Sequence, residues 1–98
     1  MLVLGLGGGD VIRLLKKYLA QAKITAVEIE QEVVDIAQIY FGIIPNSKLK
    51  IKVADAKMYM SVNKRKHDLV IVDLYMGDEV PEFVEQNKFL TEIARALK

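Results

Sequence analysis

The sequence contains no cysteine, which excludes a disulfide framework, a thiolate metal site and a cysteine nucleophile. The sequence also lacks a clear excess of either sign of charge, because 14 basic residues stand against 13 acidic ones, for a net charge of +1. A near-neutral chain gives no general electrostatic reason to bind nucleic acid. No apolar run approaches the roughly 20 residues of a membrane span, and the start lacks the pattern of an export signal. We therefore expect no nucleic-acid and no membrane partner, and we take a cytoplasmic location as the default.

The chain alternates short apolar runs with helical patterns, which is typical of βαβ units on a parallel sheet. Its 98 residues make one domain at most. The apolar runs are residues 1–4, 24–27, 49–53 and 69–72. With right-handed crossovers and a glycine turn after the first run, the pattern predicts an α/β, Rossmann-like, three-layer fold with a parallel sheet of about four strands in the order 3-2-1-4.

The helical segments have apolar residues at i, i+3, i+4 and i+7 spacing. In the first segment, the predicted core-facing residues are Val11, Leu14, Leu15, Tyr18, Leu19 and Ala22. In the last, they are Phe89, Leu90, Ile93, Ala94 and Leu97. Gly42 predicts the end of the second helix, and the apolar–basic alternation of residues 49–53 predicts a half-exposed strand near a sheet edge.

The predicted sheet is incomplete. Residues 69–72 form the most apolar strand, yet the strand order places it at an edge. The sequence ends directly after a helix, whereas nucleotide-binding α/β folds usually continue with more strands. We therefore interpret residues 1–98 as a single domain that is a fragment of a larger nucleotide-binding α/β fold, or as a homo-oligomer subunit whose fourth strand is covered by a partner. The alternative is a small domain whose last helix covers that edge.

Residues 5–10 read Gly-Leu-Gly-Gly-Gly-Asp between a strand and a helix. Glycines let the backbone turn sharply and let a ligand approach closely, and a helix N-terminus supplies free N–H groups. Gly5, Gly7 and Gly9 are thus candidate ligand contacts, and the alternative is a plain tight turn with Asp10 as the helix N-cap. Asp10 would repel a pyrophosphate but tolerate a sulfonium. This disfavours a dinucleotide oxidoreductase and favours a cationic ligand such as S-adenosylmethionine.

Carboxylates follow the other predicted strands. Glu28 lies about 20 residues past the glycine turn, where an acid meets ribose hydroxyls; we interpret Glu30 as a helix N-terminal acid. Asp55 either accepts from an adenine amine or only caps a short helix. Asp73, at the end of the fourth strand, is predicted to face the reactive end of the ligand.

Two further features follow or precede the fourth strand. Tyr75 is a candidate wall of the site, and Asp78 is a second, poorer catalytic candidate after Asp73. His67, the lone histidine, lies among basic residues and is interpreted as a surface residue.

The pattern resembles the spermidine synthase family of polyamine aminopropyltransferases, within the class I S-adenosylmethionine-dependent methyltransferase fold. The resemblance rests on residues 2–10, the Ala-Val-Glu-Ile-Glu of 26–30, the Val-Ala-Asp-Ala of 53–56, and residues 68–73 running on to the Gly-Asp-Glu-Val-Pro of 77–81. It implies that residues 1–98 are a single S-adenosylmethionine-type nucleoside-binding domain of a truncated methyltransferase-like fold. It also implies S-adenosylmethionine or its decarboxylated form as co-substrate, an amine acceptor and no metal. It implies that the turn glycines line the co-substrate, that Glu28 holds the ribose, that Asp55 holds the adenine amine and that Asp73 lies near the amine acceptor. Further candidate contacts are the neighbouring residues Asp10, Ile29, Ala56 and Tyr75.

Two positions depart from the family pattern. Gly8 stands where these enzymes usually have an acid, and Met76 stands where they have a second acid after the one that matches Asp73. The sequence therefore favours a spermidine-synthase-like transferase domain without choosing between aminopropyl and methyl transfer or naming the acceptor. Whether the chain acts as an enzyme by itself stays open. The alternative is a non-catalytic, truncated Rossmann-like domain that self-associates.

Overall fold

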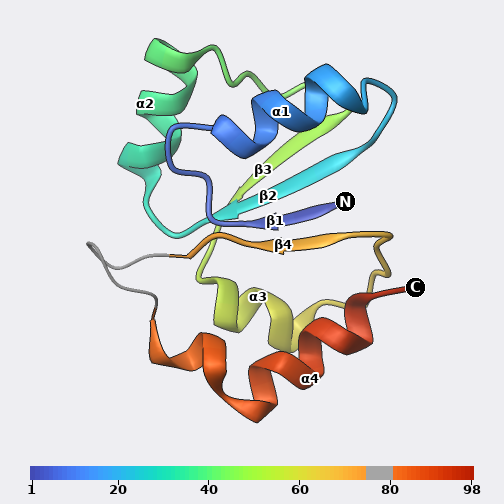
Figure 1. Ribbon diagram of the computed structural model, residues 1–98. Helices are drawn as coiled ribbons and strands as arrows, with labels where there is room; N and C mark the ends of the chain where they lie inside the picture. The colour runs from blue at the N-terminus through green and yellow to red at the C-terminus, as the bar shows by residue number, and fades with distance from the viewer. Residues whose placement is uncertain (75–80) are drawn as a thin grey trace.

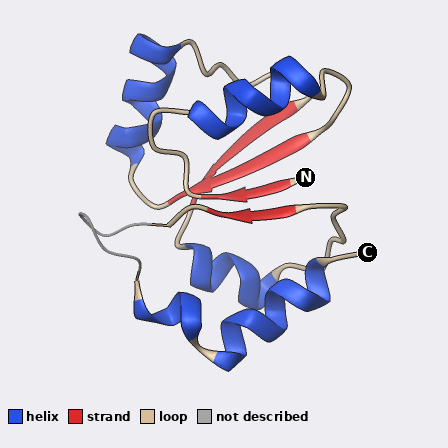
Figure 2. Ribbon diagram, in the orientation of Figure 1, coloured by secondary structure: helices blue, strands red, loops and turns tan. Residues whose placement is uncertain are grey.

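The computed structural model describes residues 1–74 and 81–98. Four strands form a single parallel sheet: β1 (Leu2–Leu4), β2 (Ile24–Glu28), β3 (Leu49–Val53) and β4 (Val70–Val72). The sheet order is β3-β2-β1-β4, so the predicted topology is confirmed. The strands all run in one direction, and their carboxyl ends meet at one side of the molecule (Figure 2).

Helices cover both faces of the sheet and make three layers (Figure 1). They are α1 (Asp10–Tyr18), α2 (Gln31–Phe41), α3 (Ala56–Val62) and α4 (Asn87–Ala96), with a short 3-10 helix η1 (Glu82–Glu85) before α4. The α1 and α2 helices lie on one face, and α3 and α4 lie on the other. None of the helices in residues 1–74 and 81–98 is long and apolar enough to cross a membrane.

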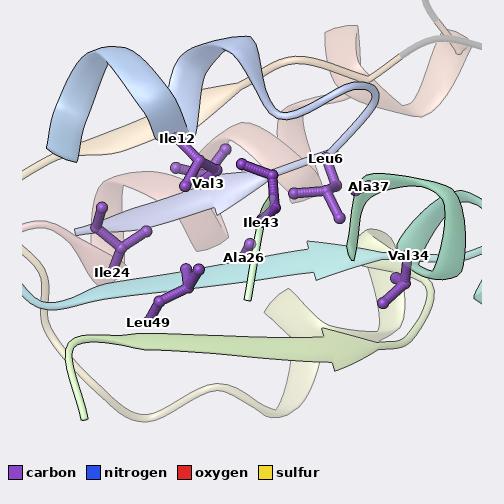
Figure 3. Packing of buried hydrophobic residues seen from close by; sticks show 9 residues of the cluster. All are labelled: Val3, Leu6, Ile12, Ile24, Ala26, Val34, Ala37, Ile43 and Leu49. Carbon is purple, nitrogen blue, oxygen red and sulfur yellow. The ribbon is translucent and has the colours of Figure 1, made fainter. Parts of the chain in front are cut away.

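The core consists of two clusters, one on each face of the sheet, because alternate strand residues point to opposite faces. The first cluster lies beneath α1 and α2 (Figure 3) and contains Val3, Leu6, Ile12, Ile24, Ala26, Val34, Ala37, Ile43 and Leu49. The second cluster lies against α3 and α4 and contains Leu2, Leu4, Val27, Ala56, Met60, Phe89 and Ala96. The central strands β1 and β2 are thus buried on both faces, as their continuous apolar sequences predict.

The predicted core face of α1 is only partly correct. Ile12 is fully buried, with Val11 and Leu15 packed beside it, whereas Leu14 is 56% exposed and Tyr18 is 71% exposed. Leu14 lies two residues after Ile12, which places it on the opposite side of a helix with 3.6 residues per turn. The helix begins directly after the glycine turn, so the turn sets which side faces the sheet.

Other local predictions are confirmed. Gly42 ends α2 with a φ of 68°, and its N–H donates to the Ala37 carbonyl. The β3 strand lies at the sheet edge with Lys50 and Lys52 exposed.

The predicted core face of α4 is only partly correct. Phe89 is buried and Ile93 packs beside it, whereas Leu90 and Leu97 are 47% and 39% exposed, Ala94 is exposed, and Ala96 is buried instead.

Candidate functional site

Gly5 joins the ends of three strands. Its N–H donates to the Val27 carbonyl at 2.7 Å, and the Asp73 N–H donates to the Leu4 carbonyl at 2.8 Å. Gly5 has a φ of +97°, and a Cβ at this position would overlap the backbone carbonyl of Asp73. A glycine is therefore required here, because both the left-handed backbone and the close approach of Asp73 exclude a side chain. This approach brings the end of β4 to the glycine turn.

Glu28 is held by two backbone donors. Its Oε1 accepts from the Leu6 N–H at 3.0 Å, and its Oε2 accepts from the Glu30 N–H at 3.1 Å. The side chain ends β2 and is half-buried. An ionised carboxylate has about four acceptor sites, so lone pairs remain on both oxygens for a ligand. The carboxylate is thus fixed in one orientation before any ligand binds.

A cavity of about 680 Å³ opens where the strands end. Six of the residues predicted for the site line it: Gly5, Glu28, Ile29, Asp55, Ala56 and Asp73. They come from the ends of all four strands, which the sheet order brings together. The apolar part of the wall includes Leu74, Pro81 and Phe83, and the Phe83 ring packs edge-to-face on Phe89 with centroids 5.0 Å apart.

The cavity is acidic. Four carboxylates line it, those of Glu28, Glu30, Asp55 and Asp73, and no described lining residue is basic. A group of like charges without counter-charges favours a cationic ligand, because the attraction is strongest where protein excludes water. Glu30 was not predicted for the site. The sequence signal that could have indicated its place in the cavity is its position two residues after Glu28, directly after the end of β2.

Asp55 serves the fold as well as the cavity. Its Oδ1 accepts from the Lys57 N–H at 2.8 Å and so caps α3. The predicted capping role is therefore confirmed. The other carboxylate oxygen has no hydrogen bond to the described residues, and Asp55 lies in the cavity wall. Capping therefore leaves an acceptor for a ligand.

Three predicted residues do not line the cavity. Gly7 lies in the exposed outer part of the turn, and Gly9 is the N-cap of α1, where it packs against Ile43. Asp10 is not the N-cap, so that alternative is wrong. It is the first residue of α1, its side chain is 86% exposed, and it forms an ion pair with Arg13. Tyr75 and Asp78 lie outside the described residues.

His67 lies away from this cavity, at the opposite ends of the strands. Its backbone N–H donates to the Ala96 carbonyl at 2.6 Å, and its backbone carbonyl accepts from the Lys98 N–H at 3.0 Å. The ring is half-buried, and its Nε2 is buried without a partner among the described residues. Burial lowers the pKa of His67, and the nearby N-terminal ammonium, Arg65 and Lys98 lower it further. His67 is therefore a partly buried residue at the surface, and its backbone joins the start of β4 to the end of α4.

No group of three or more histidine and carboxylate side chains within residues 1–74 and 81–98 is placed to hold a metal ion. The candidate site is a cavity lined by carboxylates at the end of β1, where the glycine turn begins.

Sequence comparison finds a match to a family model described as the spermine/spermidine synthase domain, over residues 1–98. A polyamine aminopropyltransferase of Vibrio vulnificus is 30% identical over 100 residues, which cover 99% of this chain and 33% of that protein. A probable polyamine aminopropyl transferase of Bifidobacterium longum is 30% identical over 96 residues, which cover 98% of this chain and 21% of that protein. The chain thus spans about a third or less of the length of these relatives.

Comparison with solved structures shows the same fold at low sequence identity. Human methyltransferase-like protein 13 in complex with SAH superposes with a TM-score of 0.89 and 23% identity, over 99% of this chain and 49% of that one. A probable spermidine synthase from Corynebacterium glutamicum has a TM-score of 0.84 and 24% identity, over 100% and 36%. Spermidine synthase from Thermotoga maritima has a TM-score of 0.79 and 22% identity, over 99% and 34%. The Rossmann-like methyltransferase fold is therefore confirmed.

Proposed function

The chain belongs to the spermine/spermidine synthase family, and on that premise we propose that its acidic cavity binds decarboxylated S-adenosylmethionine for aminopropyl transfer to an amine. The observation that carries the proposal is the set of four carboxylates around the glycine turn, with no basic residue in the described lining. The transfer activity of the whole protein and the amine acceptor are parts of this proposal as well.

Glu28 is the proposed ribose ligand. Its two oxygens are oriented by the Leu6 and Glu30 N–H groups, and each oxygen keeps a lone pair that can accept from one ribose hydroxyl. Hydrogen bonds to a charged acceptor contribute roughly 1.5–3 kcal/mol each. A pre-oriented carboxylate also loses little conformational entropy when the ligand binds.

The charge of the cavity favours the decarboxylated co-substrate over S-adenosylmethionine itself. S-adenosylmethionine carries an α-carboxylate, which needs a basic or N–H partner when it leaves water. The described lining has no basic side chain to supply one. The decarboxylated form carries only the cationic sulfonium and ammonium, which the acidic lining of the cavity complements as a whole. This argument favours aminopropyl over methyl transfer.

Asp55 and Asp73 have separate roles in the proposal, one toward the adenine and the other toward the acceptor amine. The free oxygen of Asp55 is the proposed acceptor for the adenine amine. Asp73 lies beside the glycine turn and orients the acceptor amine and takes up its proton. The amine lone pair forms the new C–N bond, the C–S bond breaks, and its electron pair stays on sulfur, so methylthioadenosine leaves. Asp78 stays a second candidate for the amine, outside the described residues.

Isothermal titration of the chain with decarboxylated S-adenosylmethionine and with methylthioadenosine tests this proposal. We expect at least one of them to bind with a dissociation constant below about 1 mM, or about −4 kcal/mol. Asp73→Asn should keep the binding of methylthioadenosine, because Asp73 is assigned to the amine. If neither ligand binds in this range, the proposed binding role of the cavity is wrong.

A further inference from the structure

A second hollow, of about 340 Å³, lies on the α3 side of the sheet. Four of its lining residues are basic, namely Lys50, Lys52, Lys64 and Arg65, and no lining residue is acidic. Tyr59, Asn63 and Thr25 also line it. We call this hollow the basic groove. It shares no residue with the acidic cavity, so it stands independently of the proposed transferase function.

The fold brings these cations together from separate parts of the sequence. Lys50 pairs with Thr25 and Lys52 with Val27 in the β2–β3 register, which puts both lysines on the α3 face of the edge strand. Two positions along a strand separate them by about 6.6 Å. The α3 helix ends at Val62, and the loop after it carries Lys64 and Arg65 to the same hollow.

The four cations lack counter-charges within the described residues. The ion pairs found there are Arg13 with Asp10 and Lys98 with Asp68, and none involves the basic groove. Cations that have no ion-pair partner among the described residues attract an anion, and salt screens this attraction because the side chains are exposed.

Protection of an edge strand from aggregation is one use of exposed lysines, and it accounts for Lys50 and Lys52 on the edge strand β3. It does not account for the other two cations of the groove. Lys64 and Arg65 do not belong to the strand at all. A neighbouring hollow shares Thr25 and Arg65 with the groove and adds Lys23 and Lys66, together with Lys98 and its ion-pair partner Asp68. The surplus of basic residues therefore continues beyond the edge strand.

We propose that the basic groove binds single-stranded nucleic acid. Proteins that bind single strands combine a basic groove for the phosphates with aromatic side chains on which bases stack, and Tyr59 supplies a half-buried ring in this groove. An acidic peptide would use the cations but gain nothing specific from the ring. The expectation of no nucleic-acid partner came from the net charge of +1, which averages an acidic cavity and a basic groove that the fold keeps apart.

Fluorescence anisotropy with a labelled oligouridine of about 12 nucleotides tests the proposal, since single-strand sites span roughly 4–16 nucleotides. We expect a dissociation constant below about 100 μM at about 50 mM salt, weakening as salt rises, with a log–log slope near −3 for four phosphate contacts. Lys50→Glu with Lys52→Glu should weaken binding at least about tenfold and reduce the slope by about 1.4. Tyr59→Leu should weaken it about fivefold or more through lost stacking.

The matched control is Lys16→Glu with Lys17→Glu on α1, which makes the same change in net charge on the other face of the sheet. This control should change the affinity less than about threefold. Thermal unfolding of each variant shows that it folds. Equal losses in the groove and control variants would overturn the proposal, as would an absence of binding at low salt. It would also be overturned if polyglutamate bound as tightly as oligouridine and Tyr59→Leu had no effect, because the partner would then be an acidic protein segment.

Discussion

The carboxylate of Glu28, at the end of β2, accepts a hydrogen bond from the backbone N–H of Leu6 in the glycine turn, at 3.0 Å. This hydrogen bond therefore connects Glu28, the residue proposed to bind the ribose, directly to the glycine turn over which the co-substrate would lie. Since the other oxygen of Glu28 accepts from the Glu30 N–H, the same side chain also fixes the start of α2. A change at Glu28 acts on ligand binding and on the shape of the site together.

Glu28→Ala should weaken binding of methylthioadenosine by about 30- to 1000-fold, or about 2–4 kcal/mol, through the lost ribose contacts. It should also lower the free energy of unfolding by about 1–3 kcal/mol, because the Leu6 N–H loses its partner. Titration calorimetry and urea unfolding measure the two effects. Glu30→Gln is the control, because its side chain accepts no hydrogen bond from the described backbone; it should keep the ribose contacts. An affinity loss below threefold for Glu28→Ala would remove Glu28 from the ribose role.

Gly5→Ala should lower the free energy of unfolding by about 2–5 kcal/mol, because the new Cβ would meet the Asp73 carbonyl in a strained backbone. Gly7→Ala is the matched control. Gly7 also has a positive φ, of +52°, but no atom lies within 4 Å of the position of a Cβ, so only the backbone strain of about 1–2 kcal/mol applies. Urea unfolding compares the two variants. Equal losses would show that the close approach of Gly5 to Asp73 is not what requires glycine.

Stability should depend on pH through His67. Its pKa is lowered in the folded protein by burial and by nearby positive charges, so the unfolded chain binds more protons than the folded chain near the ordinary histidine pKa. The free energy of unfolding therefore rises with pH in this range and falls as pH drops below about 6.5. His67→Gln should make the unfolding midpoint less dependent on pH between about 5 and 7.5. An unchanged pH dependence in the variant would contradict this account of His67.

Self-association through the β4 edge stays a prediction. The β4 strand pairs with β1 on one side and ends the sheet of the described residues on the other, with Leu69 40% exposed beside it. If a second copy covers this edge, light scattering will give the mass of a dimer, and Val72→Pro will reduce it, because the register with β1 leaves the Val72 N–H on the free side of β4. A monomeric mass at high concentration would contradict the prediction.

The strand order and the set of strand-end carboxylates could be predicted from the sequence because both follow from local signals. Alternating apolar runs and a glycine turn define the sheet order, and carboxylates that end neighbouring parallel strands must meet. The positions of Glu28, Asp55 and Asp73 in one cavity follow from this rule.

Other features depend on contacts that no local pattern contains. The buried side of α1 is set by the glycine turn, so Ile12 is buried in the core and Leu14, which was predicted there, is exposed. Asp10 has the right spacing for an N-cap, but Gly9 takes that position and Asp10 pairs with Arg13. The basic groove depends on β3 and the loop after α3 meeting, which net charge cannot indicate. The proposed roles of Tyr75 and Asp78 stay predictions.

The most direct test of the central claim is the ratio of the affinities of the chain for decarboxylated S-adenosylmethionine and for S-adenosylmethionine, measured by titration calorimetry in one buffer. An acidic cavity with no basic residue in its described lining predicts that the decarboxylated form binds at least about tenfold more tightly, a difference of about 1.4 kcal/mol. Equal affinities, or tighter binding of S-adenosylmethionine, would contradict the assignment of the cavity to an aminopropyl donor.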